Sequence, residues 1–293
     1  MHRSRLVLLT GLLALTAACG QPQAAPEPGI ASGVAKDAEL AKLVPQRLNG
    51  KLRIASSIGG TPPSAFYADD GKTAQGVDID VADAAAKLLG LEVERQAASF
   101  EAILPALTSG KYDAGTGNFG VTEERKKTID FVTYINDGQG FAARKDSALQ
   151  DVKKLDQLCG LKIGTGTGTT FQTTLERNKE VCADAGKPAY EVQVFSDTGA
   201  TQLALKQGHV DVIMSTINGL RHLTANQPDF RFLGEFRRLD VGFALPKGSD
   251  LAPALRQAVD RLISDGTYQR ILRRWGVEPS AIPRSELNPA EHT

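Results

Sequence analysis

Arg125 is the side chain whose type and setting most clearly suggest ligand chemistry. It follows the glycine-rich run GTGNFG at 115–120, which can bring backbone donors close to a bound molecule. A guanidinium is planar and can make two parallel charge-assisted hydrogen bonds to a carboxylate. We expect a short strand at Tyr112–Ala114 and a turn after it, at the edge where open α/β sheets bind ligands. The pattern predicts a carboxylate clamp; a surface arginine beside Glu123 and Glu124 is the alternative.

A second turn, Gly166–Thr170, is rich in glycine and threonine. It lies between an expected strand and an expected helix, so its N–H and hydroxyl groups can meet an anion at the helix start. The run lacks the lysine of a P-loop and a complete G-x-G-x-x-G, so it does not indicate a nucleotide site.

Strands and helices alternate on both sides of these turns. Apolar runs and glycine stops predict the order β, α, β, α, β in the first half, at 51–57, 76–90, 91–96, 99–110 and 112–114. The pattern restarts with expected elements at 161–164, 168–178, 190–195, 198–208, 210–214 and 217–227. A further strand at 241–246 and a helix pair at 251–276, broken at Gly266, follow. This alternation indicates two α/β units with mostly parallel sheets and a ligand cleft between them.

The N-terminus has the features of an export signal. Arg3 and Arg5 precede an apolar run from Leu6 to Ala18, which is too short for an ordinary membrane span of about 20 residues. Small residues before Cys19 resemble a lipobox, although Leu15 and Thr16 depart from the usual leucine position. We expect a signal peptide at 1–18 and a lipidated Cys19 that anchors the protein to the outer face of the membrane. Cleavage nearby, giving a freely secreted chain, is the alternative.

The charge composition limits the kinds of partner that the protein is expected to bind. The 293 residues carry 34 basic and 34 acidic side chains, and removing Arg3 and Arg5 leaves a net charge of minus two. Neither balance suggests binding to nucleic acid or to an anionic membrane. Residues 19–49 are rich in Pro, Ala and Gln and should act as a flexible tether.

Two cysteines remain after lipidation, Cys159 and Cys182. Disulfides persist in an exported, oxidising setting, so we predict that these two cysteines pair, with buried free thiols as the alternative. The four histidines show no metal-ligand spacing near them, and no metal or cofactor is expected.

Taken in order, several strings resemble the bacterial family 3 solute-binding proteins. They are LRIA, GVDIDVADAAAKLLG, FEAILPALTSGKYDAG, VTEERKKTIDFVTY, the GTT of Gly168–Thr170, LKQGHVDVIM and DGTYQRILRRWG, and they cover nearly all of 51–276. The resemblance implies a two-lobed α/β fold of the periplasmic-binding-protein type II, with hinge strands near 140–144 and 241–245. It predicts lobe 1 at 50–141 plus 243–276, lobe 2 at 142–242, and a C-terminal tail at 277–293 with little regular structure.

The resemblance also implies ligand contacts. Arg125 matches the arginine that binds the ligand α-carboxylate, with backbone N–H groups near Asn118 and Gly120 completing that site. Phe100 matches an apolar wall, although a core role is common for phenylalanine. Thr61 and Ser64 replace aromatic residues of relatives, so Phe66 or Phe119 is expected to supply the missing wall. Second-lobe contacts fall on Thr169 and Thr170.

Thr216 marks a departure from the family pattern. Relatives that bind free α-amino acids place an aspartate here to pair with the ammonium, and a buried ammonium without an acid would be costly. Asp197 or Glu101 could supply the charge, Asn218 is a neutral candidate, and a local alignment shift is a further alternative. We expect a ligand with a carboxylate and a modified, secondary or absent amine.

The resemblance predicts a monomeric binding lipoprotein that delivers a polar amino acid or related solute to the permease and ATPase of an ABC importer. A sensor that reports to a membrane receptor is an alternative. A lyase like cyclohexadienyl dehydratase is another, but it needs a positioned acid or base. The sequence shows no G-x-S-x-G motif, and neither His209 nor His222 falls at a matched cleft position, so no catalytic residue is predicted.

Overall fold

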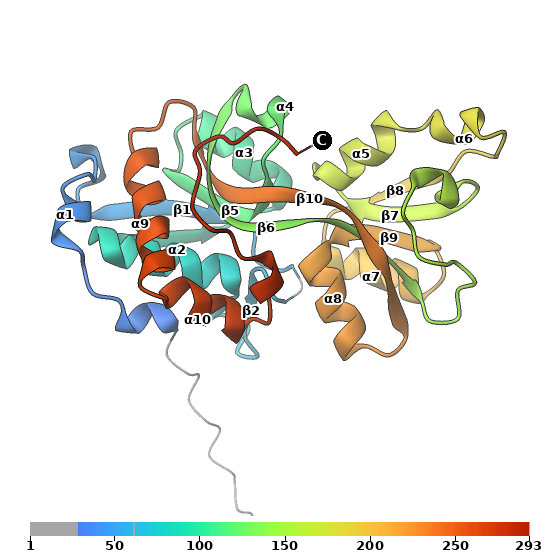
Figure 1. The fold of residues 1–293 in the computed structure, drawn as a ribbon, viewed down its shortest axis with the longest axis horizontal. Coiled ribbons are helices and arrows are strands. Elements are labelled where there is room, and N and C mark those ends of the chain that lie inside the picture. Colours follow the sequence, from blue (N-terminus) through green and yellow to red (C-terminus); the bar gives the residue numbers. More distant parts are fainter. Residues whose placement is uncertain (1–28, 61, 293) are drawn as a thin grey trace, which may run out of the picture.

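The computed structural model describes residues 29–60 and 62–292. Two α/β lobes lie side by side and share one eight-stranded sheet with the order β4-β1-β5-β10-β6-β9-β7-β8 (Figure 1). The predicted signal peptide, Cys19 and Thr61 lie outside the described residues. In the described part of the chain, no helix is long and apolar enough to cross a membrane.

The first half of the chain follows the predicted alternation. Its main elements are β1 (Lys51–Ser56), α2 (Val77–Leu89), β4 (Glu92–Ala97), α3 (Phe100–Thr108), β5 (Ala114–Gly120), α4 (Glu123–Lys126) and β6 (Ile129–Arg144). A hairpin of β2 (Phe66–Tyr67) and β3 (Ala74–Gln75) interrupts the loop after β1. Before β1 come the short turns η1 (Ile30–Gly33), α1 (Ala38–Ala41) and η2 (Gln46–Leu48).

The second half repeats the pattern. It contains η3 (Leu155–Leu158), β7 (Lys162–Gly166), α5 (Thr170–Arg177), α6 (Val181–Asp184), β8 (Glu191–Phe195), α7 (Thr198–Lys206), β9 (Val212–Thr216) and α8 (Ile217–Asn226). The chain returns through β10 (Phe230–Pro246) to α9 (Ala252–Ser264), α10 (Thr267–Arg274) and η4 (Glu278–Ser280). Gly266 adopts a left-handed conformation between α9 and α10, which confirms the predicted break.

Two long antiparallel strands, β6 and β10, connect the lobes (Figure 1). β10 pairs with β5 of the first lobe from Val241 to Ala244. β6 pairs with β9 of the second lobe from Gln139 to Ala143. Between these two paired regions, β6 and β10 pair only with each other. The chain therefore crosses from one lobe to the other at about 135–138 in β6 and 238–240 in β10. This crossing lies before the hinge positions expected from the sequence.

The run GTGNFG is the strand β5, so the prediction of a turn there was wrong. Its small residues let the strand pass beneath neighbouring side chains. A Cβ at Gly115 would lie 2.7 Å from Ile103, and one at Gly117 would lie 2.8 Å from Ser57. Glycine therefore serves close packing here. The left-handed residue is Asn118, with φ of 56°.

Residues 29–49 do not form the flexible tether that was expected. Ala31 and Leu48 are buried, and Ile30, Val34, Leu40 and Val44 pack against the core of the first lobe. The backbone N–H of Asp37 also donates to Leu88 at the end of α2. The scattered apolar residues of this Pro- and Ala-rich stretch thus pack against the core, although the stretch has no long apolar periodicity.

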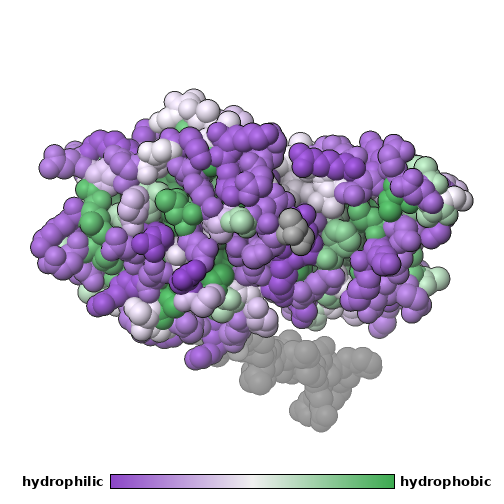
Figure 2. Space-filling view, turned by 45° about the horizontal axis from the view of Figure 1, so that its top comes forward, coloured by the Kyte–Doolittle hydropathy of each residue, from purple (hydrophilic) through white to green (hydrophobic). Residues whose placement is uncertain are grey.

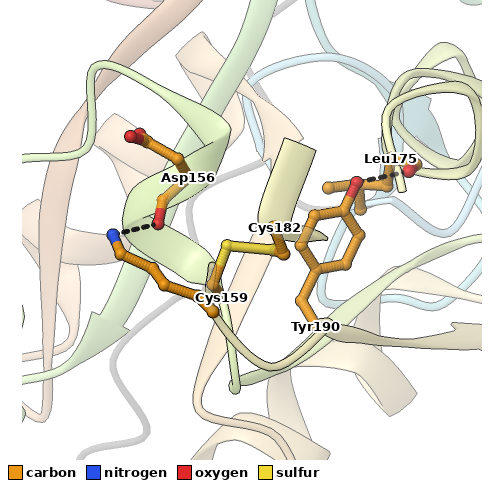
Figure 3. The surroundings of a disulfide bond; sticks show 6 residues. Asp156, Cys159, Leu175, Cys182 and Tyr190 are labelled. Atoms are coloured by element: carbon orange, nitrogen blue, oxygen red, sulfur yellow. Dashed lines mark hydrogen bonds between the residues drawn. A yellow bond between two sulfur atoms is a disulfide. The ribbon is translucent and has the colours of Figure 1, made fainter. Parts of the chain in front are cut away.

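The second-lobe core lies on both faces of β7 and β9. Cys159 and Cys182 form a disulfide within one of its clusters, which confirms the predicted pairing (Figure 3). The bond joins the segment after η3 to α6. Beside it, the Tyr190 hydroxyl donates to the Leu175 carbonyl at 2.5 Å. The face of the molecule shown in Figure 2 is largely hydrophilic, with apolar residues in separate groups.

Candidate functional site

A cleft of about 480 Å³ lies between the lobes. Its walls come from the segments that follow β1, β4, β7, β8 and β9, together with β5, the start of α2 and Arg125. The carboxyl ends of these strands and the N-termini of α3, α5, α7 and α8 therefore converge on one space. The volume suits a small solute, and the helix ends favour negative charge.

Arg125 lies in the cleft wall, in the single-turn helix α4. Its Nη1 donates to the carbonyl of Gly120 at 2.9 Å, and its Nη2 donates to the carbonyl of Gly168 in the second lobe at 3.0 Å. Three of the five guanidinium N–H groups remain for a ligand. Among the described residues, no carboxylate lies within ion-pair distance of the guanidinium. Burial lowers the pKa of Arg125 to about 10, and Glu291 acts in the opposite direction, so the side chain is charged at neutral pH.

Phe100 forms the aromatic wall of the cleft. Its ring stacks on Phe119 at 4.6 Å, and the Arg125 guanidinium lies 5.7 Å from the Phe100 ring centre. Phe119 is fully buried and supports Phe100 from behind. Phe66 instead packs edge-to-face on Trp275 at 5.6 Å and is absent from the described cleft lining. The structure thus places neither alternative in the missing wall.

The three threonines predicted from the second lobe, Thr169, Thr170 and Thr216, are among the threonines that line the cleft. Thr169 and Thr216 are N-cap residues, and their hydroxyls accept from the backbone N–H groups of Gln172 and Gly219. These caps fix the starts of α5 and α8 against the cleft.

Three further residues of the predicted site, Asn118, Gly120 and Asn218, make hydrogen bonds within the protein. Asn118 lines the cleft, but its Nδ2 donates to Asp137 at 3.1 Å. The Gly120 carbonyl holds Arg125. Asn218 is buried outside the described lining, where its N–H donates to Asp137 and its Oδ1 accepts from Ser280.

Two acids line the cleft, Asp78 and Asp197. Asp197 is exposed and is the N-cap of α7, where its Oδ1 accepts from the Ala200 N–H at 2.7 Å. A carboxylate has further acceptor sites after this bond. Glu101 is absent from the described lining, although its Cβ lies 3.1 Å from the position of a Cβ at Gly168.

Sequence reasoning did not identify Asp78 or Asp137. The available signal for Asp78 was an acid between the apolar residues Val77 and Ile79 at the start of α2. Its Oδ1 accepts from the Tyr134 hydroxyl at 2.8 Å, and its Oδ2 has no partner among the described residues. Asp137 lies on β6 and accepts from Asn118 of the first lobe and Asn218 of the second. Burial raises the pKa of each acid to about 6.

The raised pKa of Asp137 predicts a pH-dependent effect of Asp137→Asn. An acid whose pKa rises on folding binds its proton more tightly in the folded state, so its contribution to stability falls as pH rises from about 4 to 6. Removing the charge should therefore make the variant more stable relative to wild type at pH 7.5 than at pH 4, by up to about 3 kcal/mol. Urea unfolding at both pH values measures this difference.

Asp113→Asn is the matched control with the opposite sign. Burial would raise the pKa of Asp113, but hydrogen bonds and charge from Arg53 and Arg47 lower it overall. Its substitution should therefore destabilise the protein more at pH 7.5 than at pH 3. If the stability of both variants changed with pH in the same direction, the opposite pKa shifts of Asp137 and Asp113 would be contradicted.

No group of three or more potential metal-ligating side chains occurs among residues 29–60 and 62–292. The cleft instead offers a guanidinium, an aromatic face, hydroxyls and two carboxyl groups. Two α/β lobes that enclose such a cleft and share two crossing strands define the class of two-lobed, type II solute-binding folds.

Comparison with known proteins identifies the family. Residues 52–278 match the bacterial extracellular solute-binding proteins of family 3, and the chain belongs to this family. It is 30% identical to the arginine-binding protein ArgT of Corynebacterium glutamicum, over 85% of this chain and 83% of that protein. It is 29% identical to the ABC transporter glutamine-binding protein GlnH of Bacillus subtilis, over 71% and 74%. An ancestral arginine-binding protein bound to arginine superimposes with a TM-score of 0.69 at 33% identity, covering 77% and 98%.

Proposed function

We propose that this protein is the solute-binding component of an ABC importer. It captures a polar amino acid or a related carboxylate-bearing solute in the interlobe cleft and delivers it to the permease and ATPase. The observation that carries this proposal is Arg125, a cation in the cleft wall without a described carboxylate partner. The relatives named for arginine and glutamine binding support the same class of solute.

In this proposal, Arg125 binds the solute carboxylate and Phe100 packs against its aliphatic part. Thr169, Thr170 and Thr216 contribute from the second lobe, so a solute would contact both lobes at once. Hinge closure around the solute follows from this arrangement. The protein works as a monomer on the outer face of the membrane, held by a lipidated Cys19, and its lobes meet at the crossing near 135–138 and 238–240.

Asp197 is our candidate for the partner of a solute ammonium. It places a carboxylate in the cleft even though Thr216 occupies the position of the usual aspartate. This favours a free ammonium over the modified or absent amine that the sequence alone suggested.

A thermal-shift screen of the protein against amino acids, opines, betaines and small carboxylates tests the proposal. A solute at 100 times its Kd should add about 2.7 kcal/mol of stability. Stabilisation by carboxylate-bearing solutes, and not by their amides or esters, is the expected result. Equal stabilisation by an acid and its amide would contradict a carboxylate clamp.

Asp197→Asn should weaken binding of L-arginine roughly 10- to 100-fold, since a hydrogen bond to a charged group contributes about 1.5–3 kcal/mol. The variant keeps the cap of α7, because asparagine caps helices as well as aspartate does. Titration calorimetry is carried out with L-arginine and with 5-guanidinopentanoate, which lacks the α-ammonium. The comparison separates the loss of an ammonium contact from any other effect of the substitution.

Only L-arginine should lose affinity in the Asp197→Asn variant. Asp184→Asn, on the surface helix α6, is the control and should change neither affinity. Equal losses for both compounds would exclude Asp197 as the ammonium partner.

A further inference from the structure

The C-terminal strap, residues 285–292, has little regular structure, as the sequence predicted, but it packs against β6. It pairs with residues 131–133 of β6, along the same edge that β9 occupies further on at 139–143. The Thr133 N–H donates to the Glu286 carbonyl at 3.0 Å, Val132 forms an antiparallel bridge with Leu287, and the Asn288 N–H donates to Phe131 at 2.9 Å. The strap then continues towards the crossing between the lobes (Figure 1).

Beyond Asn288 the strap contacts α4, which carries Arg125. Glu123 and Glu291 hold each other reciprocally. The Glu123 N–H donates to Glu291 Oε2 at 2.8 Å, and the Glu291 N–H donates to Glu123 Oε1 at 3.2 Å. Lys126 joins them, since its Nζ lies 2.7 Å from Glu123 Oε1 and 2.8 Å from the Pro289 carbonyl.

The same glutamate also contacts β10. Arg237 Nη2 donates to Glu291 Oε1 at 2.7 Å and to the His292 carbonyl, and His292 Nε2 lies 2.9 Å from Asp240 Oδ2. Arg237 pairs with Gln139, whose side chain donates to the Thr170 carbonyl of the second lobe at 3.2 Å. Glu291 therefore links α4 of the first lobe to the second-lobe end of the crossing.

A one-turn helix needs such support. α4 has four residues, and an isolated turn of this length is unstable because nucleation fixes several residues for one hydrogen bond. Within α4's own segment, the Thr122 hydroxyl accepts from the Arg125 N–H. Glu291 satisfies a second N–H at the same helix start, and bidentate binding demands an accurately placed guanidinium.

We infer that Glu291 is a positioning residue for Arg125 and that the C-terminal strap couples the carboxylate site to the crossing strands. The inference rests on the proposed function for its ligand and on the contacts above for its mechanics. The Glu291 carboxylate accepts hydrogen bonds from Glu123 and Arg237, neither of which belongs to the described cleft lining, so Glu291 acts through α4.

The main test is Glu291→Ala in the otherwise unchanged protein. Amide hydrogen exchange at Glu123 and Arg125 should become roughly 10-fold faster or more, because one anchor of the turn is lost. The Kd for L-arginine should rise about 5- to 20-fold, because a less firmly held α4 places the Arg125 guanidinium less accurately for bidentate binding. The Tm of the ligand-free protein should stay within about 2 °C, since the strap pairing with β6 is retained.

Two variants control this test. Glu286→Ala changes the same residue type in the same strap, where the side chain contacts Arg284, and should leave both α4 exchange and Kd unchanged. Glu291→Gln keeps an oxygen that can accept from Glu123 but removes the charge. If Glu291 positions α4, the Glu291→Gln variant should bind L-arginine nearly normally. If Glu291 instead acts on Arg125 through its charge, Glu291→Gln and Glu291→Ala should change binding equally.

Unchanged α4 exchange in Glu291→Ala would overturn the inference, and so would equal changes in the Gln and Ala variants. If the wild-type protein does not bind L-arginine, L-arginine is excluded as a solute of the proposed importer. The exchange measurement still decides the role of Glu291, because it needs no ligand.

Discussion

Arg125→Ala is expected to weaken binding of a carboxylate solute roughly 100- to 1,000-fold. Paired hydrogen bonds from a guanidinium to a carboxylate are charge-assisted, and losing them costs about 3–4 kcal/mol after partial compensation by water. The site has no described second cation to replace Arg125 in the cleft lining. Titration calorimetry with L-arginine measures the loss, and the thermal shift caused by the ligand should disappear with it.

Two further variants make the Arg125 prediction specific. Arg125→Lys keeps the charge but loses the planar fork, so it should bind with an intermediate affinity. Arg284→Ala removes an arginine that is 75% exposed and pairs with Glu286, and it should bind normally. An Arg125→Ala variant that folds and keeps the wild-type Kd would exclude the carboxylate clamp.

Removing the Cys159–Cys182 disulfide is the second large expected effect. The bond closes a loop with a sequence separation of 23, for which the chain-entropy account gives about 3.5 kcal/mol of stabilisation. The double variant Cys159→Ala, Cys182→Ala should lose about that much free energy of unfolding, or roughly 10 °C in Tm. Urea unfolding and calorimetry measure the two quantities.

Reduction supplies the control for the disulfide prediction. A reducing agent should lower the stability of wild type towards that of the double variant and leave the variant unchanged. Neither cysteine lines the cleft, so the variant should still bind solute below its Tm. Equal stability of oxidised wild type and double variant would contradict the expected contribution.

The order of the fold could be predicted because its signals are local. α2 shows the apolar spacing of a helix and ends at Gly90, which adopts the left-handed conformation of a C-cap. The family resemblance rested on the order of several such strings, and the match over residues 52–278 confirms it.

Other features could not be read locally because they depend on packing between distant segments. The run GTGNFG contains three glycines and suggested a turn, but it forms β5, and α3 packs so closely over Gly115 that no side chain fits there. Phe66 and Phe119 were equivalent candidates in the sequence. Contacts with Trp275 and Phe100 decide that one packs beside α10 and the other behind the cleft wall.

Residue type and spacing determined the alternating α/β elements, the disulfide partners and the family through which Arg125 was matched to a carboxylate site. The tertiary structure decided what surrounds Arg125: the carbonyl of Gly168 from the second lobe, the aromatic pair behind it, and the strap through Glu291. The physical reason is distance along the chain. Glu123 and Glu291 are 168 positions apart, and only the folded sheet brings their backbone and carboxylate groups into contact.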